Sequence, residues 1–124
     1  MARISTSVTP KIAYAALVGR VIEHYRLKAG VNQGQIAHAL GITQSAYSRL
    51  EQGQSAMNVV QLNAVATQLR MTPAQLLQDA ERYVAHLRAQ GVEITNDKQG
   101  SSGAGLLIAL GLLAALIAAA GSAE

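Results

Sequence analysis

Residues 31–53 read VNQGQIAHALGITQSAYSRLEQG, and this stretch decides the fold. Gly41 lies in its middle and suits the left-handed backbone of a tight turn, which other residues adopt only at a steric cost. The small Ala37 allows a second helix to approach the first closely. The stretch therefore predicts two short helices joined by a tight turn. The apolar residues that can face a common core at helical spacing are Ile36, Leu40, Ile42, Tyr47 and Leu50.

Each of the two helices has a capping residue at its start. Asn32 and Thr43 can each accept a hydrogen bond from an amide of the first turn that has no partner in the helix. Together the helices form a helix-turn-helix, whose second helix lies in the major groove of DNA. Glutamine can pair with adenine, arginine with guanine and serine with either, although such residues are also ordinary on a soluble helix face. If Tyr47 and Leu50 point inward, the outer face carries Gln44, Ser45, Ser48 and Arg49.

The part of the chain from Val18 to Leu77 resembles the Cro/CI-type (XRE) helix-turn-helix family of phage repressors and bacterial transcriptional regulators. The resemblance rests on Ala37, the turn Gly41-Ile42, the segment TQSAYSRLEQG and the later segment VVQLNAVATQLRMTPAQLL. It implies an all-α fold with a five-helix domain like that of lambda repressor. It also implies that residues 43–51 form a recognition helix that contacts double-stranded DNA.

The resemblance assigns roles to individual residues. Gln44 and Ser45 match base-contacting positions at the start of the recognition helix, and Arg49 matches a later groove or backbone contact. Gln33 matches a glutamine that contacts a phosphate and supports the first recognition residue. The contacts to the DNA backbone are accordingly expected from Gln33, Asn32, Thr43 and Ser48.

The resemblance also implies a structural ion pair, and the chain departs from the family at three positions. Arg26 falls where the family has an arginine paired with the glutamate of its E-x-G turn, here Glu51. Tyr47 replaces a valine or isoleucine, so its hydroxyl needs a partner or solvent. Gly34 replaces a better helix former, at a cost of up to about 1 kcal/mol. Met57 stands where a proline often begins the next helix.

Helices are predicted on both sides of the motif, and no strand is predicted. Residues 10–29 form an extended first helix that ends at Gly30. Asn58 begins another helix, with Val59, Leu62, Val65, Ala66 and Leu69 inward. Thr72 and Pro73 begin an extended last helix that ends near residue 90. Its apolar stripe covers the core or forms a dimer surface, and we expect a dimer surface because two-fold operators require two recognition helices. The stripe consists of Leu76, Leu77, Ala80, Tyr83, Val84 and Leu87.

Composition and charge argue against an enzyme. The chain has no Cys, and the three His residues lack metal-ligand spacing, so we expect no catalytic residue, cofactor or metal site. Residues 10–71 contain six Lys and Arg against two Glu, a balance that suits contact with phosphates. Residues 1–9 are predicted to be a flexible arm without a secretory signal.

The tail is the second unusual feature. After a polar linker, residues 91–102, the chain reads GAGLLIALGLLAALIAAAG over residues 103–121. A helix of that length spans about 28 Å, close to the hydrocarbon core of a bilayer. Gly111, Ala115 and Ala119 recur at every fourth position and allow close helix packing. Three interpretations follow: a membrane anchor, which we favour, an oligomerisation helix in a bundle of identical tails, or a flexible tail.

The sequence therefore predicts a bacterial, sequence-specific DNA-binding regulator of transcription, such as a repressor, that acts as a homodimer or higher homo-oligomer. Its DNA-binding domain, residues 10–90, is expected in the cytoplasm, tethered to the inner membrane if the tail spans it. The alternative function is a membrane-tethered adaptor whose helix-turn-helix domain binds a protein partner rather than DNA.

Overall fold

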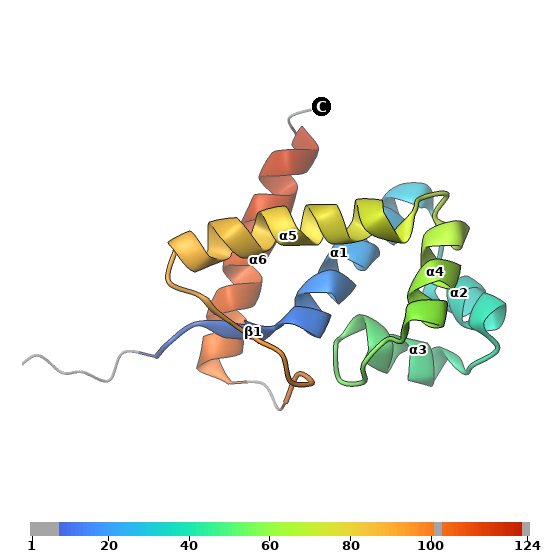
Figure 1. Cartoon of the computed structure of the whole chain (residues 1–124), viewed down its shortest axis with the longest axis horizontal. Helices are drawn as coiled ribbons and strands as arrows, with labels where there is room; N and C mark the ends of the chain where they lie inside the picture. Colours follow the sequence, from blue (N-terminus) through green and yellow to red (C-terminus); the bar gives the residue numbers. More distant parts are fainter. Residues whose placement is uncertain (1–7, 101–102, 123–124) are drawn as a thin grey trace, which may run out of the picture.

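The computed structural model describes residues 8–100 and 103–122 of the 124-residue chain. Most of the predicted N-terminal arm lies outside the described residues. The predicted all-α class with a C-terminal apolar helix is confirmed, and two very short strands are added to it. The elements, shown in Figure 1, are β1 (Lys11–Ala13), α1 (Tyr14–Ala29), α2 (Gln33–Leu40), α3 (Gln44–Glu51), α4 (Val59–Gln68), α5 (Pro73–Ala89), β2 (Glu93–Thr95) and α6 (Ala104–Ser122).

Side-chain caps begin the four helices α2 to α5, as the sequence predicts. The side chain of Thr43 accepts a hydrogen bond from the amide of Ala46 at 3.0 Å. At the other three helices, the side-chain oxygen of a glutamine in the first turn also accepts a hydrogen bond from the backbone amide of the capping residue. The two reciprocal hydrogen bonds form a capping box. The N-termini of these four helices, whose first amides have no partner within the helix, are thus fixed by residues close in sequence. The capping boxes pair Asn32 with Gln35, Asn58 with Gln61 and Thr72 with Gln75.

The first helix begins at Tyr14 and not at Pro10, which corrects the predicted start. The three preceding residues form β1, which pairs in parallel with β2 so that Ile12 lies opposite Ile94. The segment predicted as a plain linker therefore contains a strand. Ile12 is fully buried, and the hydrogen bonds of β1 come from residues about 80 positions away, which helical periodicity cannot detect.

The apolar stripe of α5 lies in the core of the chain, so the prediction that it forms a dimer surface is wrong. Leu76, Ala80 and Leu87 have no exposed area, and Val84 is 3% exposed. Helices α1, α4 and α6 and strand β2 all pack against α5. The structure instead agrees with the alternative, in which the extended last helix, α5, covers the core beside the first helix, α1.

Helix α4 contributes less to the core than its sequence predicts. Val65 and Ala66 are buried and Leu69 is 7% exposed, but Val59, also predicted to be inward, is 81% exposed. Val59 lies in the first turn of α4, directly after the cap at Asn58. Leu62 is half-buried against the core as predicted, so among the predicted inward residues of this helix Val59 is the one that is not covered.

The C-terminal helix α6 packs on the domain through one side. It contacts β1, α5 and α1, and Ala109 and Leu113 on this side are buried. A Cβ atom at Gly105 would lie 2.5 Å from the carbonyl oxygen of Thr9, so only glycine permits this approach. In Figure 1, α6 crosses α5 at the end of the molecule away from α2, α3 and α4. The tail is thus a helix docked on the domain rather than a flexible segment.

By length and composition alone, α6 could also cross a membrane. Its span Ala104–Gly121 has a mean hydropathy of 2.4, and 17% of these residues are buried. A long apolar helix of this kind is a weak indication by itself, since core helices of soluble proteins can have the same composition. The membrane interpretation and the oligomerisation interpretation both remain predictions.

Candidate functional site

Helix α3 exposes a polar face and buries an apolar one. Tyr47 has no exposed area and Leu50 is 6% exposed, whereas Gln44, Ser45 and Arg49 are exposed. The side chain of Arg49 makes no hydrogen bond or ion pair with the described residues, so its guanidinium is available to a ligand. The three residues predicted to contact bases therefore lie together on the outer face of α3.

A buried ion pair joins α1 to the end of α3. Arg26 donates from Nε to Glu51 Oε2 at 2.9 Å and from Nη2 to Glu51 Oε1 at 3.0 Å. Arg26 is 6% exposed and Glu51 is 1% exposed. The third guanidinium nitrogen, Nη1, donates to the carbonyl oxygen of Val31 at 3.1 Å. This is the bidentate pair that the resemblance implies, and it fixes α3 relative to α1 and to the start of α2.

Two further side chains bind the same carboxylate. The Tyr47 hydroxyl donates to Glu51 Oε2 at 2.9 Å, and Gln33 Nε2 donates to Glu51 Oε1 at 2.9 Å. Burial and the neighbouring carboxylate raise the pKa of Tyr47 well above its usual value, so its hydroxyl keeps its proton. The hydrogen bond to Glu51 likewise raises the pKa of Arg26. Glu51 thus accepts four charge-assisted hydrogen bonds at the C-terminal end of α3.

The residues predicted to contact the DNA backbone have roles within the fold. Asn32 and Thr43 use their side-chain oxygens as helix caps, which leaves the side-chain amide hydrogens of Asn32 and the hydroxyl hydrogen of Thr43 as donors for a ligand. Gln33 donates to Glu51, so its link to α3 runs through that carboxylate, and its predicted contact with a phosphate stays a prediction. Ser48 is half-buried and accepts a hydrogen bond from Gln52 Nε2 at 3.0 Å.

Two exposed glutamines beyond α3 extend its polar face and were missed from the sequence. Gln52 donates to Ser48, and Gln54 Nε2 donates to Gln52 Oε1 at 2.9 Å. The side-chain amides of these two glutamines continue the exposed polar face of α3 past the end of the helix. The spacing of four residues between Ser48 and Gln52 is the signal that could have identified the first contact.

Small residues set the distances between the helices of the motif. Ala37 is 2% exposed, and Gly41 has a φ of 70° in the turn after α2. A Cβ atom at Gly19 would lie 1.7 Å from the carbonyl oxygen of Glu51, so α1 and the end of α3 meet backbone to backbone. The close packing of α1 on α3 therefore requires glycine at position 19.

The outer face of the motif has little negative charge. Glu51 is buried against Arg26, and on α1 Arg20 pairs with Glu23 at 3.4 Å. Of the charged residues of α2 and α3, only Arg49 is exposed. Among the described residues, no group of three or more His, Cys, Asp and Glu side chains could hold a metal ion. The face can thus accept an anionic partner through one guanidinium and several neutral hydrogen-bonding groups.

The structure is similar to two solved structures, both described as the clp gene regulator ClgR from Corynebacterium glutamicum. One is 25% identical, with a TM-score of 0.60 over 65% of this chain and 86% of that chain. The other is 23% identical, with a TM-score of 0.52 over 56% of this chain and 90% of that chain, a likeness of fold alone. A comparison with curated proteins finds no match.

A family model described as a helix-turn-helix domain matches residues 17–78, half of the chain. The match contains α2, α3 and α4, almost all of α1 and the first turns of α5. It includes every residue of the buried network around Glu51 and every exposed residue of α3. The chain therefore belongs to the helix-turn-helix domain family.

Proposed function

We propose that this protein is a sequence-specific, DNA-binding regulator of transcription of the Cro/CI type. The observation that carries the proposal is the exposed face of α3, with Gln44, Ser45 and Arg49 pointing away from a core fixed by the Arg26–Glu51 pair. A recognition helix has to be rigid, because base contacts depend on positions held within a fraction of an ångström. Four hydrogen bonds to one buried carboxylate supply that rigidity.

Each side chain has a distinct part in the proposed complex. Gln44 pairs with an adenine and Arg49 with a guanine, and Ser45 can donate to or accept from either base. The free donors of Asn32 and Thr43 contact phosphates on both sides of the groove. Gln33 acts indirectly, since its bond to Glu51 holds the start of α2 against the end of α3.

Regulation of genes is supported by the solved structures that this chain resembles. ClgR is described as a clp gene regulator. We propose that the present chain likewise regulates transcription, that it works in the cytoplasm and that it binds DNA as a dimer. A dimer places two recognition helices on successive turns of the duplex, which adds the binding free energy of two half-sites.

A membrane-tethered adaptor is the second candidate function. The observation that favours it is α6, which is long and apolar enough to span a bilayer. An adaptor would use the outer face of α3 for a protein partner and would bind DNA without sequence preference. DNA selection therefore separates the two candidates.

The test is selection of binding sites from a pool of random duplexes with the purified full-length protein. We expect the wild type to enrich a palindromic site, and Gln44→Ala to bind that site more weakly by about 1–3 kcal/mol and to lose one base preference. Gln78→Ala, which removes an exposed glutamine from α5, is the matched control and should bind as the wild type does. Absence of any enriched site would contradict the proposal and favour the adaptor.

A further inference from the structure

An apolar surface runs along the side of α6 that points away from the domain. Leu107 is 66% exposed and Ile108 is 43% exposed. Such a surface on a helix about 28 Å long is unfavourable in water and typical of a contact site. We call it the outer face of α6; its members, all exposed and all on one side at helical spacing, are Leu107, Ile108, Gly111, Ala114, Ala115 and Ala118.

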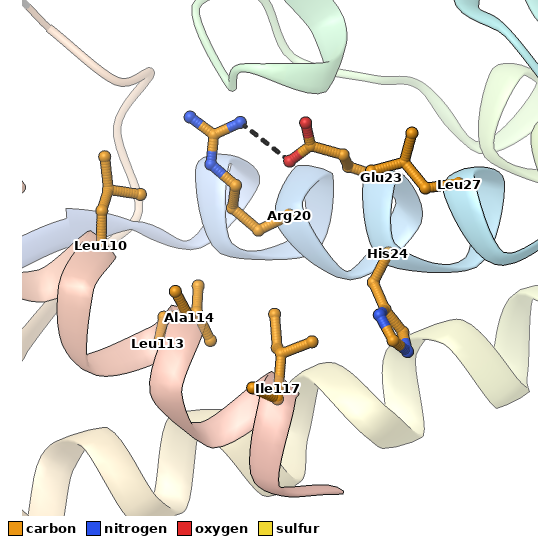
Figure 2. Close-up of a pocket in the computed structure, with 9 residues that line it drawn as sticks. Arg20, Glu23, His24, Leu27, Leu110, Leu113, Ala114 and Ile117 are labelled. Carbon is orange, nitrogen blue, oxygen red and sulfur yellow. Dashed lines mark hydrogen bonds and ion pairs between the residues drawn. The ribbon is translucent and has the colours of Figure 1, made fainter. Parts of the chain in front are cut away.

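The outer face borders a groove between α1 and α6. The groove has a volume of about 460 Å³, and its α1 wall includes Leu27, which is 65% exposed. The ion pair between Arg20 and Glu23 lies on this wall and brings two opposite charges together at the rim. The groove, shown in Figure 2, is lined by Arg20, Glu23, His24 and Leu27 on α1 and by Leu110, Leu113, Ala114, Ile117 and Ala118 on α6.

We propose that a second copy of this chain covers this surface, with the two α6 helices packed antiparallel about a two-fold axis near Gly111 and Ala115. The large side chains of the outer face, Leu107 and Ile108, lie at one end of it, and the small Ala118 lies at the other. Antiparallel packing brings the large end of each helix onto the small end of the other. Leu107 and Ile108 then enter the groove of the second copy beside its Leu27.

A parallel arrangement would fit the same surface poorly. It would place Leu107 against Leu107 at one end and Ala118 against Ala118 at the other. The large ends would hold the helices apart, and the small ends would leave a void that loses packing contacts. The distribution of large and small residues along α6 thus favours the antiparallel pair.

Charge and area are both compatible with such a dimer. The sequence has no Asp, Glu, Lys or Arg between Gln99 and Ala123, so the interface buries no unpaired charge from α6. With the α1 walls included, we expect the two copies together to bury on the order of 1,000 Å², near the lower limit for a specific interface. We therefore expect a dimer that dissociates on dilution.

The inner side of α6 argues for a protein partner rather than a lipid bilayer. Ala109 and Leu113 are buried in the domain, and Gly105 meets the Thr9 carbonyl at a distance that excludes a Cβ atom. A helix that spanned a bilayer would have to give up these fitted contacts. A second copy covers the outer face and leaves them in place.

The inference rests on the dimeric form of the proposed function, and its first test, the solution mass of the full-length protein, uses no DNA. We expect the wild type to be a dimer by light scattering. Ala115→Glu places a carboxylate at the axis and should raise the dissociation constant more than about a hundredfold. Ala85→Glu, on the exposed side of α5, is the matched control and should remain a dimer. Circular dichroism checks that both variants fold.

The second test uses single cysteines, because the chain has none of its own. Leu107→Cys and Ala118→Cys should form a disulfide with each other when the two variants are mixed. Neither should do so alone, since equivalent positions lie about 17 Å apart along an antiparallel pair.

Three results would overturn the inference. They are a monomeric wild type, disulfides between equivalent positions, and binding of the wild type to phosphatidylcholine–phosphatidylglycerol vesicles in place of dimer formation. A dimer that selects no DNA site would instead count against the proposed function alone.

Discussion

Glu51 accepts two of the three guanidinium hydrogen bonds of Arg26 inside the protein, at 2.9 and 3.0 Å, and the same two oxygens accept the hydrogen bonds of Tyr47 and Gln33. One carboxylate therefore connects α1, α2 and α3. Because Arg26 and Glu51 are both buried, the pair depends on its internal partners for stability. The orientation of the recognition helix depends on this connection.

Replacement of Glu51 should destabilise the whole domain. Glu51→Gln leaves the buried guanidinium of Arg26 without a counter-charge, and we expect the free energy of unfolding to fall by about 3–5 kcal/mol. Chemical denaturation measures the change. The matched control is Glu23→Gln, which breaks the more exposed pair with Arg20 and should change stability by less than about 1 kcal/mol. Equal effects of the two substitutions would contradict this role of Glu51.

Close contact of α1 with the end of α3 predicts a strong effect of one added methyl group. Gly19→Ala would place a Cβ atom 1.7 Å from the Glu51 carbonyl oxygen, which is backbone and cannot turn aside. We expect a loss of about 3 kcal/mol or more, measured by thermal or chemical unfolding. Gly34→Ala is the control, because its methyl meets only side-chain oxygens, at 3.3 and 3.6 Å. It should remain within about 1 kcal/mol of the wild type.

The tyrosines predict a loss of stability in alkali. Burial raises the pKa of Tyr14 and of Tyr25 to about 12, from 10.0, and raises the pKa of Tyr47 and of Tyr83 as well. Above pH 10 the unfolded chain releases these protons first, so it binds fewer protons than the fold, and the free energy of unfolding falls as pH rises.

Two measurements check the alkaline prediction. Ultraviolet absorbance should show tyrosinate near pH 10 in denaturant but only at higher pH in the native protein. Denaturant unfolding should give lower stability at about pH 11 than at about pH 9. A native titration centred at the ordinary value, with the fold intact, would disagree with the partial burial of Tyr14 and Tyr25 and with their hydrogen bonds to Glu81 and Asp79.

The sequence predicts well what local hydrogen bonds decide. The caps at Asn32, Thr43, Asn58 and Thr72 each depend on residues within four positions, and all four are present. The glycine turn after α2 is likewise local. The resemblance, rather than the periodicity, identifies the pair between Arg26 and Glu51, which lie 25 positions apart.

Contacts between distant segments were not predictable from a single sequence. Strands β1 and β2 have three residues each and no alternation of apolar and polar residues, and they form only because each supplies the hydrogen bonds of the other. The docking of α6 depends on Gly105, whose neighbour is the carbonyl of Thr9 far along the chain. The stripe of α5 is buried because α1, α4, β2 and α6 all pack against it.

At the candidate site, the sequence predicts which side chains are exposed better than it predicts which groups form hydrogen bonds with each other. Gln44, Ser45 and Arg49 are on the outer face of α3 as predicted. Gln33 has the partner Glu51 and not Gln44, because a buried carboxylate is a stronger acceptor than an exposed amide. The role of Gln44 at a base remains a prediction.

Sequence-specific binding through α3 is tested most directly by genome-wide crosslinking of the full-length protein in cells, with Gln44→Ala as the comparison. We predict a few sharp peaks over palindromic sites in the wild type and their loss in the variant. Both proteins must be present in equal amounts, as checked by immunoblot. Absence of peaks, or peaks that Gln44→Ala leaves unchanged, would contradict the assignment of α3 as a base-reading helix.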